Sequence, residues 1–272
     1  MIENNHWLSI RKIHFDQHHG APFWINRAHR LNIDIFNEIN NRDDFWKLGC
    51  LDLDTVRTTP VDNFLPQNHT EAKMPFESAG TAGDPVITYF SEDEFFQAFV
   101  EPFVQVVEQG LFPKSGPWLY LGPGGPHAVG HAAVLCSMYS YNQRPFMIDF
   151  DPRWAKKLVA GSIPATRYLE HLCEQAVHVI NKVNIKILFV TPPVLDSLCK
   201  SLVFDKRNQI EGIQLAGMNA NDEQWQAWKQ AFPNARFLIG YGNSLVGVFY
   251  PDINQQGYHI NSKRALIDLI RI

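Results

Sequence analysis

The sequence lacks paired cysteines, an excess of positive charge and any long apolar run. Its four cysteines lie far apart with no C-x-x-C pair, so we expect reduced thiols rather than a disulfide framework or a zinc knuckle. The formal net charge is −4 and lysines and arginines form no stripe, which argues against nucleic acid as a partner. The N-terminus shows no signal-peptide pattern, and apolar runs such as 185–190 are too short for a membrane span. These absences predict a cytoplasmic protein with no membrane partner.

The composition permits a large folded core. The chain has 272 residues, 45% of them hydrophobic and 19% charged, which predicts one large α/β unit or two small domains. Residues 1–75 are rich in Asn, Asp, His and aromatic residues, are interrupted by Gly and Pro, and show only short helical stretches. We expect a covering segment there and an α/β core over residues 76–272, together forming one structural unit.

Five apolar runs of strand length follow one another between residues 118 and 239, with amphipathic stretches between them. They are Trp118–Leu121, Phe146–Phe150, Ile185–Val190, Gly212–Ala216 and Arg236–Ile239. Strand, helix and strand repeated in this way predict a mostly parallel sheet with flanking helices and right-handed crossovers. Ligands of such sheets bind beyond the carboxyl ends of the strands.

Three helices carry clear sequence signals. Residues 169–183 place apolar side chains at helical spacing. Asn221, with Gln224 three residues later, forms a capping box that opens a second helix. Ser91 opens a third in the same way, with a phenylalanine stripe that we expect in the core, and Pro102 should kink or end its first part.

The stretch Phe76–Pro85 consists largely of residues too small to fill a core. It contains two glycines, two alanines, a serine and a threonine, and a strand-like run follows at residues 86–90. Glycine lets backbone N–H groups point toward one centre, and the hydroxyls add donors, so the stretch could wrap an anion such as phosphate. An ordinary Gly/Pro surface loop is the alternative.

Further turns rich in Gly or Pro follow four of the predicted strands. In chain order they are Gly122–Gly130, Thr191–Pro193, Ala216–Ala220 and Gly240–Leu245. Together with residues 78–85, they resemble the successive motifs of the adenylate-forming (AMP-binding) superfamily, from its Ser/Thr-Ser-Gly-Thr-Thr-Gly-Lys-Pro loop to its Tyr-Gly-x-Thr-Glu motif. Residues 14–16, 22–24 and 149–154 are similar to the branch linked to phenazine antibiotic biosynthesis.

The resemblance implies ATP-dependent adenylation of an aryl carboxylic acid by an AMP-binding ligase. Mg²⁺ is expected if the chain is active, and CoA, a carrier protein or a reductase would accept the acyl group. The positions implied for phosphate and nucleotide are Ser78, Gly80, Thr81, Gly83, Gly217, Met218, Tyr241, Gly242 and Ser244. Of these, Ser244 and Thr81 would act in catalysis, Ser244 by donating to the α-phosphate. His127 and Gly125 would border the acyl substrate.

Three departures from the family pattern bear on catalysis. Leu245 occupies the position of the acidic residue that helps to hold magnesium, and a leucine cannot ligate a hard cation. Asp84 stands where the loop usually has a cation, and it would repel pyrophosphate if it pointed inward. The sequence ends at Ile272, before the family's hinge and C-terminal lid domain with its catalytic lysine. A catalytically degenerate nucleotide- and aryl-acid-binding protein is therefore the alternative function.

Hydrolysis is a less favoured hypothesis. Gly242–Gly247 does not fit G-x-S-x-G, because the second glycine stands one residue too late. His127 and His131 are four residues apart, as in a helical zinc pair, but the glutamate of H-E-x-x-H is missing. The polar run 14–19 holds three histidines and an aspartate, which in such loops more often face water than bind a metal. No metal site is predicted from the sequence.

Overall fold

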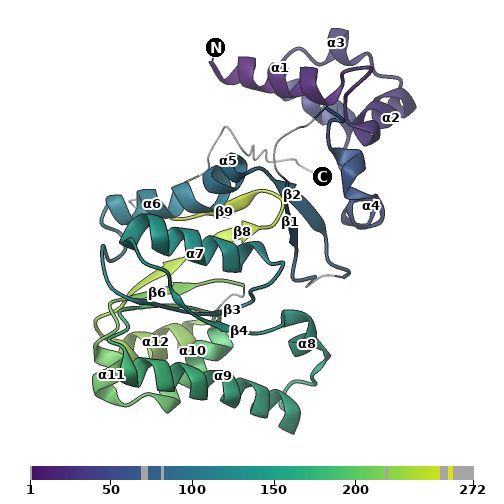
Figure 1. Cartoon of the computed structure of the whole chain (residues 1–272). Coiled ribbons are helices and arrows are strands. Elements are labelled where there is room, and N and C mark those ends of the chain that lie inside the picture. The colour runs from purple at the N-terminus through teal and green to yellow at the C-terminus, as the bar shows by residue number, and fades with distance from the viewer. Residues whose placement is uncertain (1, 69–72, 81–82, 218–219, 252–256, 260–272) are drawn as a thin grey trace. The chain divides into compact units, whose positions relative to one another are not determined.

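The structure is a computed structural model of the whole chain, which describes residues 2–68, 73–80, 83–217, 220–251 and 257–259 (Figure 1). The chain divides into two compact units. One comprises Met1–Pro75 and Gly80–Glu92, and the other comprises Phe76–Ala79 and Asp93–Ile260.

The first unit is largely helical. Its helices are α1 (Ile2–His14), α2 (Pro22–Leu31), α3 (Ile35–Glu38), η1 (Arg42–Leu48), α4 (Leu53–Thr58) and η2 (Val61–Phe64). Asp34, Asn41 and Asp52 cap the N-termini of α3, η1 and α4 by accepting hydrogen bonds from backbone N–H groups. A small core packs inside the unit and consists of Phe15, Ala28, Ile35, Ile39 and Leu48.

A five-stranded parallel sheet is the centre of the second unit, which confirms the predicted α/β class. Its strands are β3 (Trp118–Gly122), β4 (Phe146–Asp149), β5 (Ile187–Val190), β6 (Gly212–Leu215) and β7 (Arg236–Ile239), in the order β4-β3-β5-β6-β7. Each predicted strand is present within two residues of its expected bounds. All positions of β3, β5 and β6 are buried, as expected for parallel strands covered on both faces.

The strand register places all five carboxyl ends at one edge of the sheet. Gly122 pairs with Asp149, and Leu215 pairs with both Val190 and Ile239. Because β4 and β5 lie on opposite sides of β3, the strand order reverses at β3. Ligand sites in open α/β sheets lie beyond such a reversal.

Helices cover both faces of the sheet (Figure 1). On one face lie α9 (Ile163–Lys182), α10 (Pro192–Ser201) and α12 (Asp222–Ala231), with α11 (Phe204–Asn208) beside α12; on the other lie α6 (Glu101–Glu108) and α7 (Ala128–Tyr141). Alternate strand residues such as Leu119, Leu188 and Ile213 pack against α9, α10 and α12 in a continuous apolar core. The Asn221 and Gln224 capping box at the start of α12 is present as predicted.

The phenylalanine-rich helix changes its hydrogen-bonding pattern before Pro102. It runs as α5 (Glu92–Phe95), a π-helical turn η3 (Phe96–Val100) and α6. Pro102 donates no backbone hydrogen bond, and a π turn just before it is one way for a helix to accommodate this loss. Phe95 and Phe103 are fully buried, so the prediction that this stripe belongs to the core is confirmed.

Two short strand pairs complete the described structure. The strands β1 (Met74–Glu77) and β2 (Ile87–Phe90) form one pair, and β8 (Tyr241–Asn243) and β9 (Gly247–Phe249) form an antiparallel hairpin. The sequence indicated β2, but not β1 or the hairpin. The short helix α8 (Pro152–Lys157) follows β4. All four cysteines are free, and no helix in the described ranges has the length and apolar character needed to cross a lipid bilayer.

Candidate functional site

The turn from β3 to α7 lies at the point where the strand order reverses. The Tyr120 hydroxyl donates to the Pro123 carbonyl oxygen at 3.0 Å, and the Gly124 N–H donates to the carboxylate of Asp149 at the end of β4. A Cβ on Gly130 would lie only 2.6 Å from the Pro123 carbonyl oxygen, so α7 approaches this turn closely because Gly130 has no side chain. Gly125 has a φ of +55° and open space around it.

His127, at the end of the same turn, is 4% exposed. Its Nδ1 lies 2.9 Å from the carbonyl oxygen of Glu77, so Nδ1 carries the proton and donates there. The Glu77 N–H in turn donates to the Pro126 carbonyl oxygen at 2.8 Å. The buried Nε2 has no hydrogen-bond partner in the described residues, so it presents an acceptor. The position of His127 beside an acyl group stays a prediction.

The helix α8 attaches to the segment 76–79 through two cations. The Arg153 guanidinium lies 3.3 Å from the Glu77 carboxylate and 3.0 Å from that of Asp151, and Asp151 also caps α8. The Arg153 hydrogen bond lowers the pKa of Asp151, and Asp151 raises the pKa of Arg153. The Lys156 ammonium donates to the carbonyl oxygen of Ala79. Sequence reasoning missed all of these contacts, although the basic residues that follow Pro152, namely Arg153, Lys156 and Lys157, could have marked the helix as a partner for an acidic segment.

In the first unit, a cation lies beside the predicted phosphate loop after all. Gly80 and Gly83 have φ values of +60° and +138°, which side chains rarely allow. A Cβ on Gly83 would lie 3.0–3.2 Å from the Arg57 guanidinium, whose Nε donates to the carbonyl oxygen of Asp84 at 3.0 Å. The Arg57 guanidinium also forms an ion pair with the Asp54 carboxylate at 2.8 Å, so much of its charge is already neutralised. Thr81 lies outside the described residues.

The ends of β5 and β6 lie side by side at the carboxyl edge. The Ala216 N–H donates to the Val190 carbonyl oxygen at 3.3 Å. Gly217 has a φ of +89°, and a Cβ there would lie 3.8 Å from the methyl group of Thr191. The structure thus brings two predicted turns together. Met218 lies outside the described residues.

The predicted nucleotide residues near 241 form the β8–β9 hairpin. Tyr241 is 60% exposed. The side-chain oxygen of Asn243 accepts the N–H groups of Leu245 at 2.9 Å and Val246 at 3.1 Å, which places the half-buried Ser244 at the start of the turn. A Cβ on Gly242 would lie 2.5 Å from the carbonyl oxygen across the hairpin, so only glycine fits there.

The histidines of the hydrolase hypothesis make other contacts in the structure. His131 packs its ring against those of Phe76 and Phe95, at centroid distances of 5.7 and 4.9 Å. The Asp16 carboxylate accepts the backbone N–H groups of His18 and His19, which lowers its pKa. Among the residues that the structure describes, no three His, Cys, Asp or Glu side chains are grouped to hold a metal ion.

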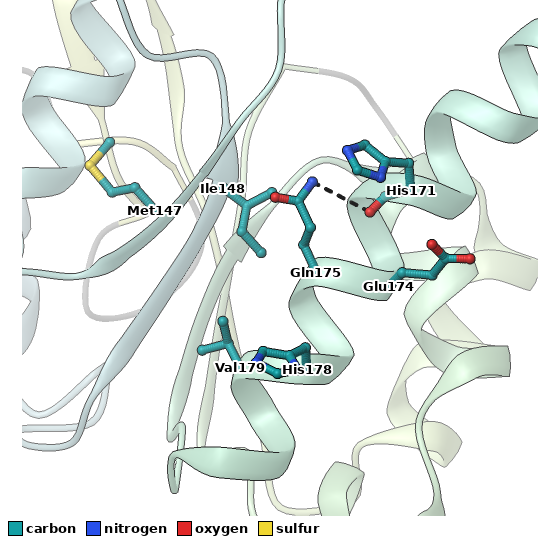
Figure 2. A pocket seen from close by; sticks show the side chains of 7 residues that line it. All are labelled: Met147, Ile148, His171, Glu174, Gln175, His178 and Val179. Carbon is teal, nitrogen blue, oxygen red and sulfur yellow. Dashed lines mark hydrogen bonds between the residues drawn. The ribbon is translucent and has the colours of Figure 1, made fainter.

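A hollow of about 440 Å³ lies between β4 and α9 (Figure 2). It is lined by Met147, Ile148, His171, Glu174, Gln175, His178 and Val179. None of the residues predicted to bind nucleotide or acid lines it. The side-chain amide of Gln175 donates to the His171 carbonyl oxygen of the preceding helical turn at 3.4 Å, as Figure 2 shows, so this polar group is used within the helix.

No family model matches the sequence, and no curated protein matches it. Among solved structures, the chain is similar to 2-hydroxyisobutyryl-CoA ligase in three states. The open form, bound to 2-HIB-AMP and CoA, has a TM-score of 0.62 at 11% identity, over 88% of this chain and 52% of that one. The postadenylation form with R3-HIB-AMP has a TM-score of 0.64 at 10% identity, over 89% and 48%. The thioesterification form has a TM-score of 0.62 at 12% identity, over 88% and 47%. The chain therefore shares the fold of the part of 2-hydroxyisobutyryl-CoA ligase that it covers, and it spans about half the length of these structures.

Proposed function

We propose that this chain binds ATP and a carboxylic acid at the carboxyl edge of its parallel sheet and joins them into an acyl adenylate. One observation carries the proposal: the turns after β3, β5, β6 and β7, which the motif order predicted, follow strands whose carboxyl ends share one edge. The similarity to an acyl-CoA ligase fold supports it.

The proposed roles follow the positions of the residues. The backbone of Ser78, Gly80, Thr81 and Gly83 would bind phosphate, while Gly217 and Met218 would line the adenine. The exposed ring of Tyr241 would lie along the nucleotide, with Gly242 allowing close approach. Ser244 would donate to the α-phosphate, and Gly125 and His127 would border the acid.

In this reaction a carboxylate oxygen attacks the α-phosphorus of ATP. A bond forms between that oxygen and phosphorus, and the bond from the α-phosphorus to the bridging oxygen breaks, so pyrophosphate leaves with the electron pair. The protein's contribution is to hold the two reactants in line and to place N–H and O–H donors where phosphoryl charge develops.

The β8–β9 turn does not fit a directly bound Mg²⁺. Residues 241–249 contain no carboxylate, Leu245 is apolar and 44% exposed, and the oxygen of Asn243 is already used by two backbone N–H groups. We therefore assign no step to a metal ion held by this turn.

A catalytically degenerate binding protein is the second candidate function. The apolar Leu245 favours it, since this turn offers no ligand for a metal ion that would help pyrophosphate to leave.

The proposal also includes the kind of acid that is bound and the acceptor of the acyl group. The sequence of residues 149–154, which begins at the end of β4 and continues into α8, favours an aryl acid of the phenazine branch. CoA, a carrier protein or a reductase would take the acyl group.

Acid-dependent exchange of labelled pyrophosphate into ATP tests the proposal. Exchange with an aryl acid supports an enzyme, whereas ATP binding without exchange with any acid supports the degenerate binder. A chain that binds neither ATP nor AMP in calorimetry contradicts both.

A further inference from the structure

The strand β4 forms one edge of the parallel sheet in the second unit (Figure 1). Within the described ranges its only strand partner is β3, and no turn forms a hydrogen bond with its backbone. An edge strand presents a row of unpaired N–H and C=O groups that pair readily with another strand. The other edge strand, β7, begins with the charged and exposed Arg236, a feature that discourages such pairing. The edge that is open to a further strand is therefore β4.

The side chains of β4 are apolar and exposed, although edge strands often carry charge. Phe146 is 45% and Met147 is 41% exposed, whereas Ile148 is buried in the core that α9 covers. Because side chains alternate along a strand, Phe146 and Ile148 share the face that α9 covers. Figure 2 shows Met147 directed to the opposite side. Both faces of this edge thus carry apolar surface that a further strand would cover.

The helix α9 adds a polar row that is complementary to itself. Four exposed side chains at positions i, i+3, i+4 and i+7 of one helical face line the hollow beside β4 (Figure 2), namely His171, Glu174, Gln175 and His178. In either direction the row has an imidazole at each end, with a carboxylate and an amide in the middle. Against an antiparallel copy of the row, the Glu174 carboxylate meets the Gln175 amide as acceptor and donor. His171 meets His178 in the same arrangement, so the row fits a two-fold axis near its midpoint.

We infer that two copies of this chain associate through β4, in antiparallel orientation about a two-fold axis, so that their two sheets become one. A contact of this kind uses the same surface on both copies and therefore requires a surface that is complementary to itself. The open edge, its exposed apolar side chains and the row on α9 meet this requirement together. The inference does not rest on the proposed function.

The alternation of side chains fixes the position of the axis. Directly opposed residues of antiparallel strands point to the same face, so each residue must meet a residue of its own face. An axis at Met147 places Phe146 beside Ile148 of the second copy, and the two Met147 side chains against each other. Both exposed apolar side chains of β4 are then covered. An axis at Ile148 would instead place Met147 beside Asp149, whose carboxylate already accepts the N–H of Gly124.

The spacing of the layers is consistent with this arrangement. The helix α9 packs on both β4 and β3, so its axis lies about half a strand spacing, roughly 2.4 Å, inward from β4. Paired strands are about 4.8 Å apart, which puts the two copies of α9 about 10 Å apart on the same face. Helices pack at distances of about 8–10 Å between their axes. The strand pairing and the helix contact can therefore form at the same time.

Sedimentation velocity of the full chain over a series of concentrations tests the inference, and a dimer is the expected result. Met147→Lys places two ammonium groups against each other at the axis and should raise the dissociation constant of the dimer at least about tenfold. Phe204→Lys is the matched control and should leave the dissociation constant unchanged, since Phe204 is 57% exposed on α11, which packs beside α12.

A cross-link tests the register independently. In a Cys50→Ser background, which removes the exposed thiol, Met147→Cys should form a disulfide between two copies when oxidised glutathione is added. The reason is that opposed Cβ atoms of an antiparallel pair are about 4.5–5.5 Å apart. Phe204→Cys in the same background should stay unlinked.

Three results would overturn the inference. The first is a chain that sediments as a monomer at every concentration, which would leave β4 to a strand of another protein. The second is a dimer that Met147→Lys does not weaken, or that Phe204→Lys weakens as much. The third is a cross-link that forms at position 204 and not at position 147. Circular dichroism checks that the variants fold, and the cross-link decides if Met147→Lys does not.

Discussion

The backbone N–H of Gly124 donates to the carboxylate of Asp149, so the turn after β3 is fixed by the end of the neighbouring strand β4. Gly122 and Asp149 are paired in the parallel register of β3 and β4. A Cβ on Gly124 would lie 2.9 Å from an Asp149 carboxylate oxygen. The turn that leads to His127 is thus positioned by one side chain from β4.

Asp149→Ala should loosen this turn, because it removes the acceptor for the Gly124 N–H. We expect a loss of about 1 kcal/mol in the free energy of unfolding, measured by urea denaturation, and a higher KM for the acid in pyrophosphate exchange. Asp149→Asn keeps an acceptor oxygen and is the control. Equal KM values for the alanine variant and the unmodified chain would contradict the positioning role.

Tyr241→Ala should weaken nucleotide binding more than Tyr241→Phe does. The ring is 60% exposed and its loss should leave stability unchanged, while stacking of a base on an aromatic ring contributes about 1–3 kcal/mol. Calorimetric titration with AMP measures the effect. If Tyr241→Ala binds AMP as tightly as Tyr241→Phe does, the ring of Tyr241 does not contact the nucleotide.

Gly247→Ala should destabilise the β8–β9 hairpin. Gly247 has a φ of +103°, and a Cβ there would lie 2.4 Å from the Ala98 carbonyl oxygen in η3. Gly110→Ala is the matched control, since Gly110 has a φ of +75° and nothing within 4 Å of the added atom. Backbone strain of about 1–2 kcal/mol is common to both variants. If Gly247→Ala loses more free energy of unfolding than Gly110→Ala in urea denaturation, the difference measures the clash with the Ala98 carbonyl oxygen.

The thiols should differ in reactivity with a disulfide reagent. Cys50 is exposed and Cys136 and Cys173 are buried, while burial raises the pKa of Cys199 to about 11. At pH 8 we expect one fast-reacting thiol in the folded chain and four in denaturant. Loss of the fast phase in Cys50→Ser assigns it, and a fast phase that persists in that variant contradicts the burial pattern.

The raised pKa of Cys199 also makes the free energy of unfolding depend on pH. Because the pKa of Cys199 is raised from 9.0 in the reference state to about 11, its contribution is complete below pH 9 and is lost as the pH rises from about 9 to 11. Cys199→Ala should show a smaller fall of the unfolding midpoint over this range. An identical fall in both proteins would mean that other groups cause it.

The sequence predicted most of the second unit but missed the hairpin and β1. The runs at 118–121 and 187–190 are apolar at every position, a signal of buried parallel strands. The strands β8 and β9 are three residues long and contain glycine and asparagine, so they carry no periodic pattern, and they form because Gly242 and Gly247 allow close backbone pairing. For the candidate site, the sequence predicted the turns at the strand ends but not the residues that contact them.

The sequence by itself determined the five strands of the parallel sheet, the helix α9 and the capping box of α12, since each depends on side-chain spacing within a short window of chain. Only the tertiary structure decided which cations contact the backbone of residues 79 and 84. Lys156 meets Ala79 across 77 residues, and Arg57 meets Asp84 across 27. Such contacts depend on how elements distant in the chain pack against one another, and spacing along the sequence does not encode that arrangement.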